Sequence, residues 1–392
     1  MSTFRFPEWR ELSRDEQIPI INLPTDKTYF VRGGPGTGKS ILAIHRIAKL
    51  HDIEPETSVK MLVYNKALQL HLAEGLAASG LDKDIVQTCH KWLYDMGCKR
   101  IGSALWGYDW GKVKQHALDR MEKEGPIGHL ILDEAQDIPK KLLEILHSVS
   151  VNATIFTDDK QAINEEGAKE GLCRLGDIRA VFEAPPGRTY DLTKNFRNTQ
   201  PILDAAYLLR PLDHGELPDR AIRTEGQIPT IRQSSIEDLV QRVETYYINN
   251  IEHDDDGNIR GPTIGIGVPR NREPEIIQVL QESEVFRSCH QLYTNSNARE
   301  GYYKANLPGA TVLPYDMMKG LEFSAVFMPI LDDSSLHAEG NDDKKSTNQN
   351  LVYVVSTRAR DVLEYSYACD MPASWLTAAI KSACTAGKIN RA

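Results

Sequence analysis

The sequence has 392 residues, of which 41% are hydrophobic and 26% are charged. This length predicts two domains, with enough apolar material for two cores. It contains no uninterrupted run of 18 apolar residues, so we expect no membrane-spanning helix. The net charge of −9 argues against a protein that holds nucleic acid by general basicity, but it leaves a local basic track open.

The six cysteines and the amino-terminal segment indicate the cellular compartment of the protein. The cysteines include no CxxC pair and no histidine partner at zinc-ligand spacing, which predicts scattered buried thiols in a reducing compartment. The first residues alternate aromatic, basic and acidic groups, unlike a signal peptide. We therefore expect a cytoplasmic protein.

Short β-branched runs alternate with longer amphipathic stretches, which predicts an α/β fold with parallel sheets and helices on both faces. In the first half, the predicted strands are 28–32, 59–65, 129–133 and 153–157, and the predicted helices are 40–50, 66–78 and 139–149. In the second half, the predicted strands are 263–268, 324–330 and 362–367, and the predicted helices are 235–251, 273–284 and 350–360. The polar residues 331–350 are expected to form a long loop. A Pro/Gly break at residues 184–188 predicts one domain of residues 1–187 and another of residues 188–392.

A glycine-rich run between a predicted strand and a predicted helix fits the phosphate-binding pattern GxxxxGK[ST]. Its residues are Gly33, Gly34, Pro35, Gly36, Thr37, Gly38, Lys39 and Ser40. The glycines let backbone N–H groups converge on phosphate oxygens, and the helix N-terminus adds positive potential. We expect Lys39 to reach the β- and γ-phosphates of ATP and the Ser40 hydroxyl to bind Mg²⁺.

A second apolar run, residues 129–132, ends in two acids, Asp133 and Glu134. At a strand tip beside the glycine-rich loop, Asp133 is expected to complete the Mg²⁺ site. Glu134 is expected to orient or deprotonate a water molecule. The two acids together favour hydrolysis over phosphoryl transfer to a small acceptor.

The acids continue as DEAQD, residues 133–137, and this run resembles the second Walker motif of the UvrD/Rep/PcrA branch of superfamily 1 helicases. Other runs similar to motifs of that family occur in the expected order, at Gln17 and at residues 63–67, 88–92, 157–161, 195–198, 319–323 and 354–360. The resemblance covers nearly the whole chain. It implies two RecA-like P-loop NTPase domains, each a mostly parallel sheet flanked by helices, with ATP hydrolysed in the cleft between them.

The resemblance also implies roles for single residues. Gln17 would read adenine, Phe196 would stack on adenine, and Glu322 of the KGLEF motif would belong to the nucleotide site. Gln161 would sense the γ-phosphate, which Arg197 and Arg358 would contact as arginine fingers. The implied catalytic set is Lys39, Asp133, Glu134, Gln161, Arg197 and Arg358.

The sequence departs from the family in its spacing and in its nucleic-acid track. The gaps before Asp133 and before residue 319 are too short for accessory domains 1B and 2B of the usual size. Residues 164–167, NEEG, stand where the family has aromatic residues that stack on bases. We therefore expect weaker binding to single-stranded nucleic acid. The remaining candidate contacts are Tyr64, Lys66, His90, Lys91, Trp92, Lys99 and Arg100, of which Trp92 is expected in the core.

Two functions remain as hypotheses. The first is an ATP- and Mg²⁺-dependent translocase or helicase on single-stranded DNA, 3′→5′ by the resemblance, with RNA left open as a substrate. The second is a nucleotide-gated DNA-binding ATPase subunit that regulates a partner protein such as a nuclease, as in bacterial antiphage systems, without processive unwinding. A small-molecule kinase is disfavoured because no acceptor site or lid is recognisable.

Overall fold

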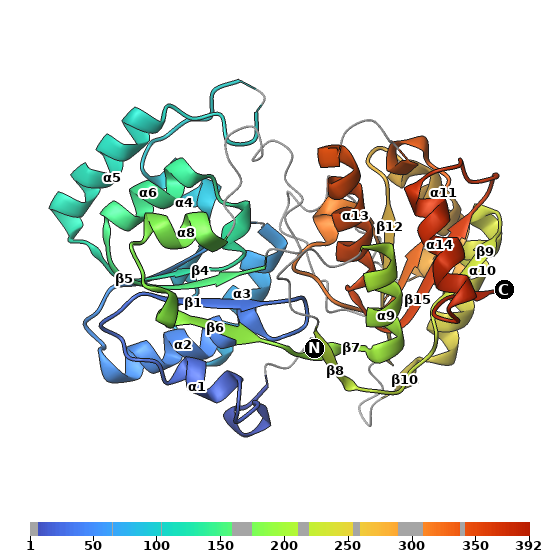
Figure 1. Cartoon of the computed structure of the whole chain (residues 1–392), viewed down its shortest axis with the longest axis horizontal. Helices are drawn as coiled ribbons and strands as arrows, with labels where there is room; N and C mark the ends of the chain where they lie inside the picture. The colour runs from blue at the N-terminus through green and yellow to red at the C-terminus, as the bar shows by residue number, and fades with distance from the viewer. Residues whose placement is uncertain are drawn as a thin grey trace. The chain divides into compact units, whose positions relative to one another are not determined.

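The computed structural model describes residues 7–64, 66–102, 104–158, 175–210, 219–253, 259–288, 309–337 and 342–392. The chain forms two compact units, one that runs to Lys194 and one from Asn195 to Ala392 (Figure 1). This division lies a few residues beyond the expected one, because β6 (Thr189–Leu192) pairs with β1 (Tyr29–Gly33) of the first sheet.

The first unit is built on a six-stranded parallel sheet in the order β3-β2-β4-β5-β1-β6. Its other strands are β2 (Val59–Val63), β3 (Val86–Thr88), β4 (Ile127–Leu132) and β5 (Ser150–Thr157). Its helices are α1 (Gln17–Ile21), α2 (Lys39–Ile53), α3 (Lys66–Ala78), α4 (Cys89–Asp95), α5 (Trp110–Glu124), α6 (Lys140–Ser148) and α8 (Leu175–Val181).

Consecutive residues of β4 point to opposite faces of this sheet, and each face has its own core. Leu130 and Leu132 belong to the apolar cluster formed with α4, α5, α6 and α8, whereas Ile131 belongs to the cluster formed with α1, α2 and α3. Figure 1 shows α4, α5, α6 and α8 on one side of the strands and α1 and α2 on the other. A sheet covered on both faces needs apolar side chains at successive positions, which explains the uninterrupted apolar run of β4.

The second unit is built on another six-stranded parallel sheet, in the order β13-β12-β14-β15-β9-β16. Its strands are β9 (Thr230–Gln233), β12 (Thr263–Val268), β13 (Gly309–Pro314), β14 (Phe323–Met328), β15 (Ala359–Tyr367) and β16 (Asn390–Arg391). Its helices are α9 (Gln200–Leu209), α10 (Ile236–Asn249), α11 (Glu273–Glu282), α12 (Glu284–Ser288), α13 (Asp342–Ser356) and α14 (Trp375–Thr385). Two small sheets pair β7 (Lys194–Thr199) with β8 (Arg220–Arg223) and β10 (Glu252–His253) with β11 (Ile259–Arg260). The predicted α/β class with mostly parallel sheets is confirmed in both units.

Strand β12 alternates isoleucine with glycine because its two faces meet different neighbours. Ile264 and Ile266 pack into the core formed with α10 and α11. On the other face, a Cβ atom at Gly265 would lie 2.5 Å from the Phe323 ring, and one at Gly267 would lie 2.8 Å from Val355 Cγ1. Side chains of the neighbouring elements therefore fill the space that larger residues would need on this face.

The prediction of a long loop at residues 331–350 is wrong. The segment holds a 3-10 helix at Ser334–His337 and the first part of α13, which ends at Ser356, earlier than the expected end at residue 360. Polar side chains in this segment are held by tertiary hydrogen bonds. Asn348 Nδ2 donates to the Ser335 carbonyl at 2.9 Å, and Asn350 Oδ1 accepts from Arg210 Nε at 2.7 Å. Such bonds leave no apolar periodicity in the sequence, so the helix could not be recognised there.

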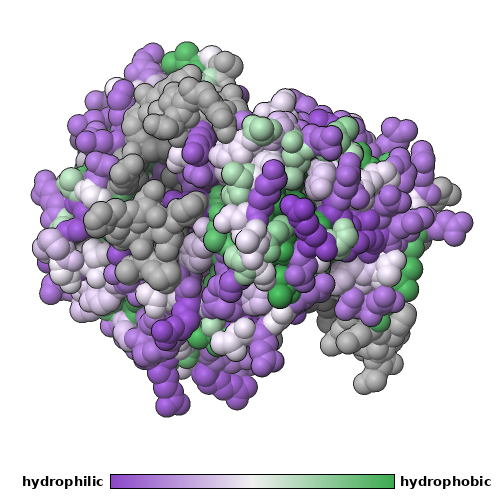
Figure 2. All heavy atoms as spheres, turned by 45° about the vertical axis from the view of Figure 1, so that its right-hand side comes forward, coloured by the Kyte–Doolittle hydropathy of each residue, from purple (hydrophilic) through white to green (hydrophobic). Residues whose placement is uncertain are grey.

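Three further features bear on the class of protein. Among the described residues, no helix has the length and apolar character that crossing a bilayer requires. Within the same ranges, Cys89, Cys98, Cys369 and Cys384 are free thiols. Cys89 and Cys98 are buried as predicted, but the prediction is wrong for Cys369, which is exposed, and for Cys384, which is partly exposed. Figure 2 shows a face on which hydrophilic side chains predominate, with smaller hydrophobic groups among them.

His129 is a buried titratable group at the start of β4. Its side chain is 1% exposed, Nε2 lies 2.9 Å from Thr154 Oγ1, and Nδ1 has no hydrogen-bond partner in the described part of the chain. Burial, helped by the charge of Arg46, lowers the pKa of His129 to about 4. The folded protein therefore keeps this ring neutral at a pH where the unfolded chain protonates it.

We expect His129 to make the protein less stable as the pH falls from about 6.5 towards 4. The pKa is lower in the folded state, so this contribution to the free energy of unfolding is fully present above the unfolded pKa and is lost towards the folded one. The loss should be about 2 kcal/mol between pH 7.5 and pH 5. Urea unfolding of the wild type and of His129→Gln at both pH values measures it. An equal pH dependence in the two proteins would contradict the assignment.

Candidate nucleotide-binding site

The glycine-rich loop joins β1 to α2. Side chains of the same segment donate hydrogen bonds to its backbone carbonyl groups. Lys39 is 6% exposed, and its Nζ donates to the carbonyl oxygens of Gly33 at 2.8 Å and Gly34 at 3.1 Å. Thr37 Oγ1 also donates to the Gly34 carbonyl, at 2.8 Å. The ammonium group therefore points into the loop, which is where the phosphates of ATP are predicted to bind.

The backbone of this loop requires glycine at three positions. Gly36 and Gly38 have φ angles of 73° and 90°, in the left-handed region that side chains disfavour. A Cβ atom at Gly33 would lie 2.7 Å from Thr37 Oγ1 and 2.8 Å from Leu192 Cβ. The pattern of glycines thus follows from the loop geometry itself.

Gln17 of α1 lies against the same loop, and its predicted contact with adenine stays a prediction. Its side chain is 4% exposed, and Nε2 donates to the Thr37 carbonyl at 3.0 Å. Oε1 accepts from the Ser13 backbone N–H at 2.9 Å. A Cβ atom at Gly38 would lie only 2.6 Å from Gln17 Nε2, so this amide packs closely against the loop.

Ser40 and Asp133 come together although 93 positions separate them in the chain. The Ser40 hydroxyl donates to Asp133 Oδ2 at 2.6 Å, and Asp133 is fully buried. Burial, with the neighbouring charge of Glu134, raises the pKa of Asp133 to about 6. A hydroxyl and a carboxylate are the hard oxygen ligands that Mg²⁺ takes, so the pair fits this ion.

Glu134 is held by a residue whose role the sequence did not reveal. Its φ of 53° is unusual for a residue other than glycine, and its Oε2 accepts from Gln136 Nε2 at 2.5 Å. Gln136 Oε1 in turn accepts from Thr157 Oγ1 at 3.1 Å and from the Asp158 N–H at 3.0 Å. The Asp158 carboxylate lies 3.8 Å from Lys39 Nζ. Gln136 thus connects the acid at the end of β4 to the end of β5.

In the second unit, Arg197 and Glu322 form one cluster, and their roles in the nucleotide site stay predictions. Arg197 Nε donates to Glu322 Oε2 at 2.7 Å, and Nη1 donates to the Thr357 carbonyl at 3.4 Å. Asn198 Nδ2 donates to the carbonyl oxygens of Thr357 at 3.1 Å and Ala359 at 2.5 Å. These bonds tie the motif at residues 195–198 to the motif at residues 354–360.

For the other predicted site residues, Arg358, Phe196 and Gln161, the described part of the structure shows no contact that assigns a role in the nucleotide site. Arg358 is 2% exposed, and its guanidinium donates to the Val354 carbonyl at 2.8 Å and to Thr357 Oγ1 at 3.2 Å. Phe196 lies half-buried in β7. Gln161 lies outside the described residues. The roles of all three in the nucleotide site stay predictions.

A family comparison identifies the chain. Residues 26–223 match the family described as Schlafen group 3, DNA/RNA helicase domain. The match covers about half of the chain, and it includes the glycine-rich loop, the two acids that follow β4 and Arg197. The chain belongs to this helicase-domain family. The narrower UvrD/Rep/PcrA assignment stays a prediction.

One relative from a virus supports the same class. A protein of Acanthamoeba polyphaga mimivirus that carries the provisional name ATP-dependent DNA helicase is 28% identical over 242 residues, which are 59% of this chain and 33% of that protein. The chain thus spans about a third of the length of this curated relative.

Two solved structures have a distant likeness to the chain. The PRRSV helicase is 14% identical, with 91% of this chain and 57% of that chain covered and a TM-score of 0.41. The C-terminal domain of a possible DNA helicase from Lactobacillus plantarum is 18% identical, with 50% and 98% covered and a TM-score of 0.31. Likenesses this distant assign no function.

This Schlafen group 3 helicase domain also carries an aromatic cluster in its first unit, formed by Tyr64, His90, Trp106, Tyr108 and Trp110. The His90 ring stacks on Trp106 at 4.5 Å between centroids and on Tyr108 at 6.0 Å. Tyr64 lies 6.3 Å from Trp106, and Trp110 lies 5.7 Å from Tyr108. Trp106, Tyr108 and Trp110 were not predicted as site residues, although aromatic residues at every second position from 106 to 110 are a signal in the sequence. Trp92 is 3% exposed and lies in the core, as expected.

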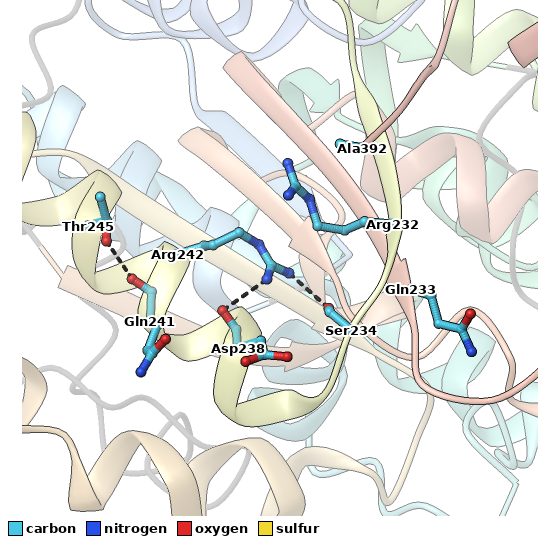
Figure 3. Close-up of a pocket in the computed structure, with 8 residues that line it drawn as sticks. All are labelled: Arg232, Gln233, Ser234, Asp238, Gln241, Arg242, Thr245 and Ala392. Carbon is cyan, nitrogen blue, oxygen red and sulfur yellow. Dashed lines mark hydrogen bonds between the residues drawn. The ribbon is translucent and has the colours of Figure 1, made fainter.

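A cavity of about 370 Å³ lies in the second unit of this helicase domain, between β9 and the start of α10 (Figure 3). Its Arg242 donates to Glu364, to the Asp238 carbonyl and to Ser234 Oγ, at 2.8 to 2.9 Å. Arg232 lies 3.4 Å from the same Glu364 carboxylate. Both arginines are therefore neutralised by a carboxylate of this unit, and none of the predicted site residues lines the cavity.

Proposed function

We propose that the protein is an ATP-driven motor that moves along single-stranded DNA, with 3′→5′ polarity. The observation that carries the proposal is the meeting of Lys39, Ser40 and Asp133 at one loop, in a chain of a DNA/RNA helicase-domain family. A phosphate-binding lysine and a hydroxyl–carboxylate pair are the parts that nucleotide hydrolysis requires. The name of the mimivirus relative points to DNA as the first substrate to test.

In this proposal the residues of the first unit bind ATP and position a water molecule. Lys39 Nζ exchanges its bonds to the Gly33 and Gly34 carbonyls for bonds to phosphate oxygens. Ser40 and Asp133 are the residues that would hold Mg²⁺, and the ion would neutralise charge on the phosphates. Glu134, oriented by Gln136, accepts a proton from the attacking water.

The other site residues enter the proposal through the family resemblance. Gln17 and Phe196 contact adenine. Gln161, Arg197 and Arg358 contact the γ-phosphate, and Glu322 orients Arg197. Removing the γ-phosphate removes the partner of the arginines, which couples hydrolysis to motion of the motor.

We expect single-stranded DNA to stimulate the ATPase rate by at least about tenfold, because a motor hydrolyses ATP fastest on its track. Phosphate release at low salt, with single-stranded DNA, single-stranded RNA and blunt duplex DNA in parallel, measures the stimulation and the choice of substrate. Displacement of a labelled strand from 3′- and 5′-tailed duplexes then measures the polarity. A rate that stays constant over a wide range of single-strand concentrations would contradict the motor.

A second candidate is a nucleotide-gated ATPase subunit that controls a partner such as a nuclease. Its support is the short connection between α4 and α5, residues 96–109, where the resembled family carries a large accessory domain. A constant ATPase rate in the experiment above would favour this candidate. A stoichiometric complex that needs ATP and persists in Glu134→Gln would then support it.

A further inference from the structure

The connection between α4 and α5 supplies much of the aromatic cluster. Trp106 and Tyr108 come from this segment and Trp110 is the first residue of α5, whereas Tyr64 follows β2 and His90 lies in the first turn of α4. Trp106 is 1% exposed and forms the base of the cluster, while Tyr64, His90 and Tyr108 remain partly exposed above it. A segment in the place of an accessory domain thus presents aromatic rings at the surface.

Two polar atoms inside the cluster lack partners. Trp106 Nε1, which can only donate, and His90 Nε2 are both buried and have no hydrogen-bond partner among the residues that the structure describes. The other ring nitrogen of His90 lies 3.0 Å from the Tyr108 hydroxyl. Buried polar groups are nearly always paired, so a cluster with two unpaired atoms is the kind of site that a polar ligand completes.

Two exposed cations, Lys99 and Arg100, lie in the same connection between α4 and α5 as Trp106 and Tyr108. Lys99 and Arg100 are exposed, and neither forms an ion pair with any residue that the structure describes. The backbone N–H of Ile101, the residue after Arg100, donates to the Gly107 carbonyl, between Trp106 and Tyr108, at 2.6 Å. Arg100 is therefore held next to the cluster, and its charge, after burial, contributes to lowering the pKa of His90 to about 4. In a chain with a net charge of −9, a free arginine beside partly exposed aromatics complements a ligand with both anionic and aromatic groups.

The cluster lies at the edge of the sheet that also carries the nucleotide site. Tyr64 follows the carboxyl end of β2, and α4 follows the carboxyl end of β3. The glycine-rich loop and Asp133 follow the carboxyl ends of β1 and β4. Because all these strands are parallel, the four segments meet at one edge of the first unit.

We propose that Tyr108 and Arg100 bind single-stranded nucleic acid, with the Tyr108 ring stacked on a base and the Arg100 guanidinium on a phosphate. The inference rests on the proposed function and specifies its nucleic-acid contact. A single strand is the occupant that matches the site, because it offers bases for the rings, phosphates for the arginine and acceptors for the unpaired N–H group. A duplex keeps its bases stacked on each other and offers no free base to Tyr108.

The test is the affinity for a fluorescein-labelled single-stranded DNA, measured by anisotropy at several salt concentrations. Tyr108→Leu should weaken binding by about tenfold and leave the salt dependence unchanged, because it removes stacking but no charge. Arg100→Gln should weaken binding by about fivefold and reduce the slope of log Kd against log salt by about 0.7, as expected for one lost phosphate contact. Tyr108→Phe, which keeps the ring, should bind within about twofold of the wild type.

Lys123→Gln is the matched control for Arg100→Gln. Lys123 is exposed in the last turn of α5, just before β4, and so lies at the opposite edge of the sheet. An equal loss of affinity in this variant would overturn the inference, because general charge would then explain both. If folded Arg100→Gln and Tyr108→Leu bind single-stranded DNA with wild-type affinity, the inference is overturned but the proposed function is not. A wild type that does not bind single strands would overturn the proposed function as well. If thermal unfolding shows that Tyr108→Leu is not folded, the surface variant Arg100→Gln decides.

Discussion

Lys39→Ala should abolish tight ATP binding and lower the ATPase rate by at least about 100-fold. The Lys39 ammonium is enclosed by the glycine-rich loop and lies 2.8 Å and 3.1 Å from two of its carbonyl oxygens, so it is positioned before a nucleotide arrives. A preorganised charge in a water-poor site stabilises developing negative charge strongly, and removing one such donor typically costs about 100- to 1,000-fold in rate. Titration with a fluorescent ATP analogue and measurement of phosphate release check the two effects.

Lys49→Ala is the control for this variant. Lys49 lies on the same helix, α2, ten positions further along, which places it about 15 Å from Lys39 along the helix axis. It should bind and hydrolyse ATP like the wild type. If Lys39→Ala also keeps wild-type affinity for ATP while folded, the glycine-rich loop is not the nucleotide site.

The parts of the site that could be predicted from the sequence are those that lie within one continuous segment. The continuous run from Gly33 to Ser40 includes the end of the strand, the turn and the start of the helix, and these shape the loop. The apolar run that ends in Asp133 likewise contains a buried strand and its tip. Both strands belong to one parallel sheet, and parallel strands bring their carboxyl ends to one edge, so the meeting of Ser40 with Asp133 could also be expected.

The parts that could not be predicted depend on bonds between distant segments. The role of Gln136 rests on its contact with the end of β5, about 20 positions away. Trp106 and Tyr108 reach the aromatic cluster only because the connection after α4 folds back onto His90. The first part of α13 carries polar residues that tertiary hydrogen bonds satisfy, so local hydrophobic periodicity gave no sign of a helix.

Arg197→Ala should leave ATP binding nearly intact and lower the turnover rate by about 1,000-fold or more. An arginine that contacts the γ-phosphate acts mainly on charge that develops during the reaction, and arginine fingers contribute about 10³–10⁵ to kcat. In the structure, the Arg197 guanidinium is oriented by Glu322 Oε2 at 2.7 Å and by the Thr357 carbonyl at 3.4 Å. Single-turnover hydrolysis at saturating ATP, with and without single-stranded DNA, separates the chemical step from binding.

Losing Arg197 also removes a structural ion pair, so the control must lose a comparable one. Arg223 is such a residue, because it pairs with Asp361 and donates to the carbonyl oxygens of Arg197 at 3.0 Å and Arg360 at 2.8 Å. Arg223→Ala should be destabilised to a similar extent but keep turnover within about tenfold of the wild type. Glu322→Gln should give a smaller loss than Arg197→Ala, because it removes the orienting charge but keeps the guanidinium. If Arg197→Ala hydrolyses ATP at the wild-type rate, Arg197 does not act on the γ-phosphate, and hydrolysis is carried by the residues of the first unit alone.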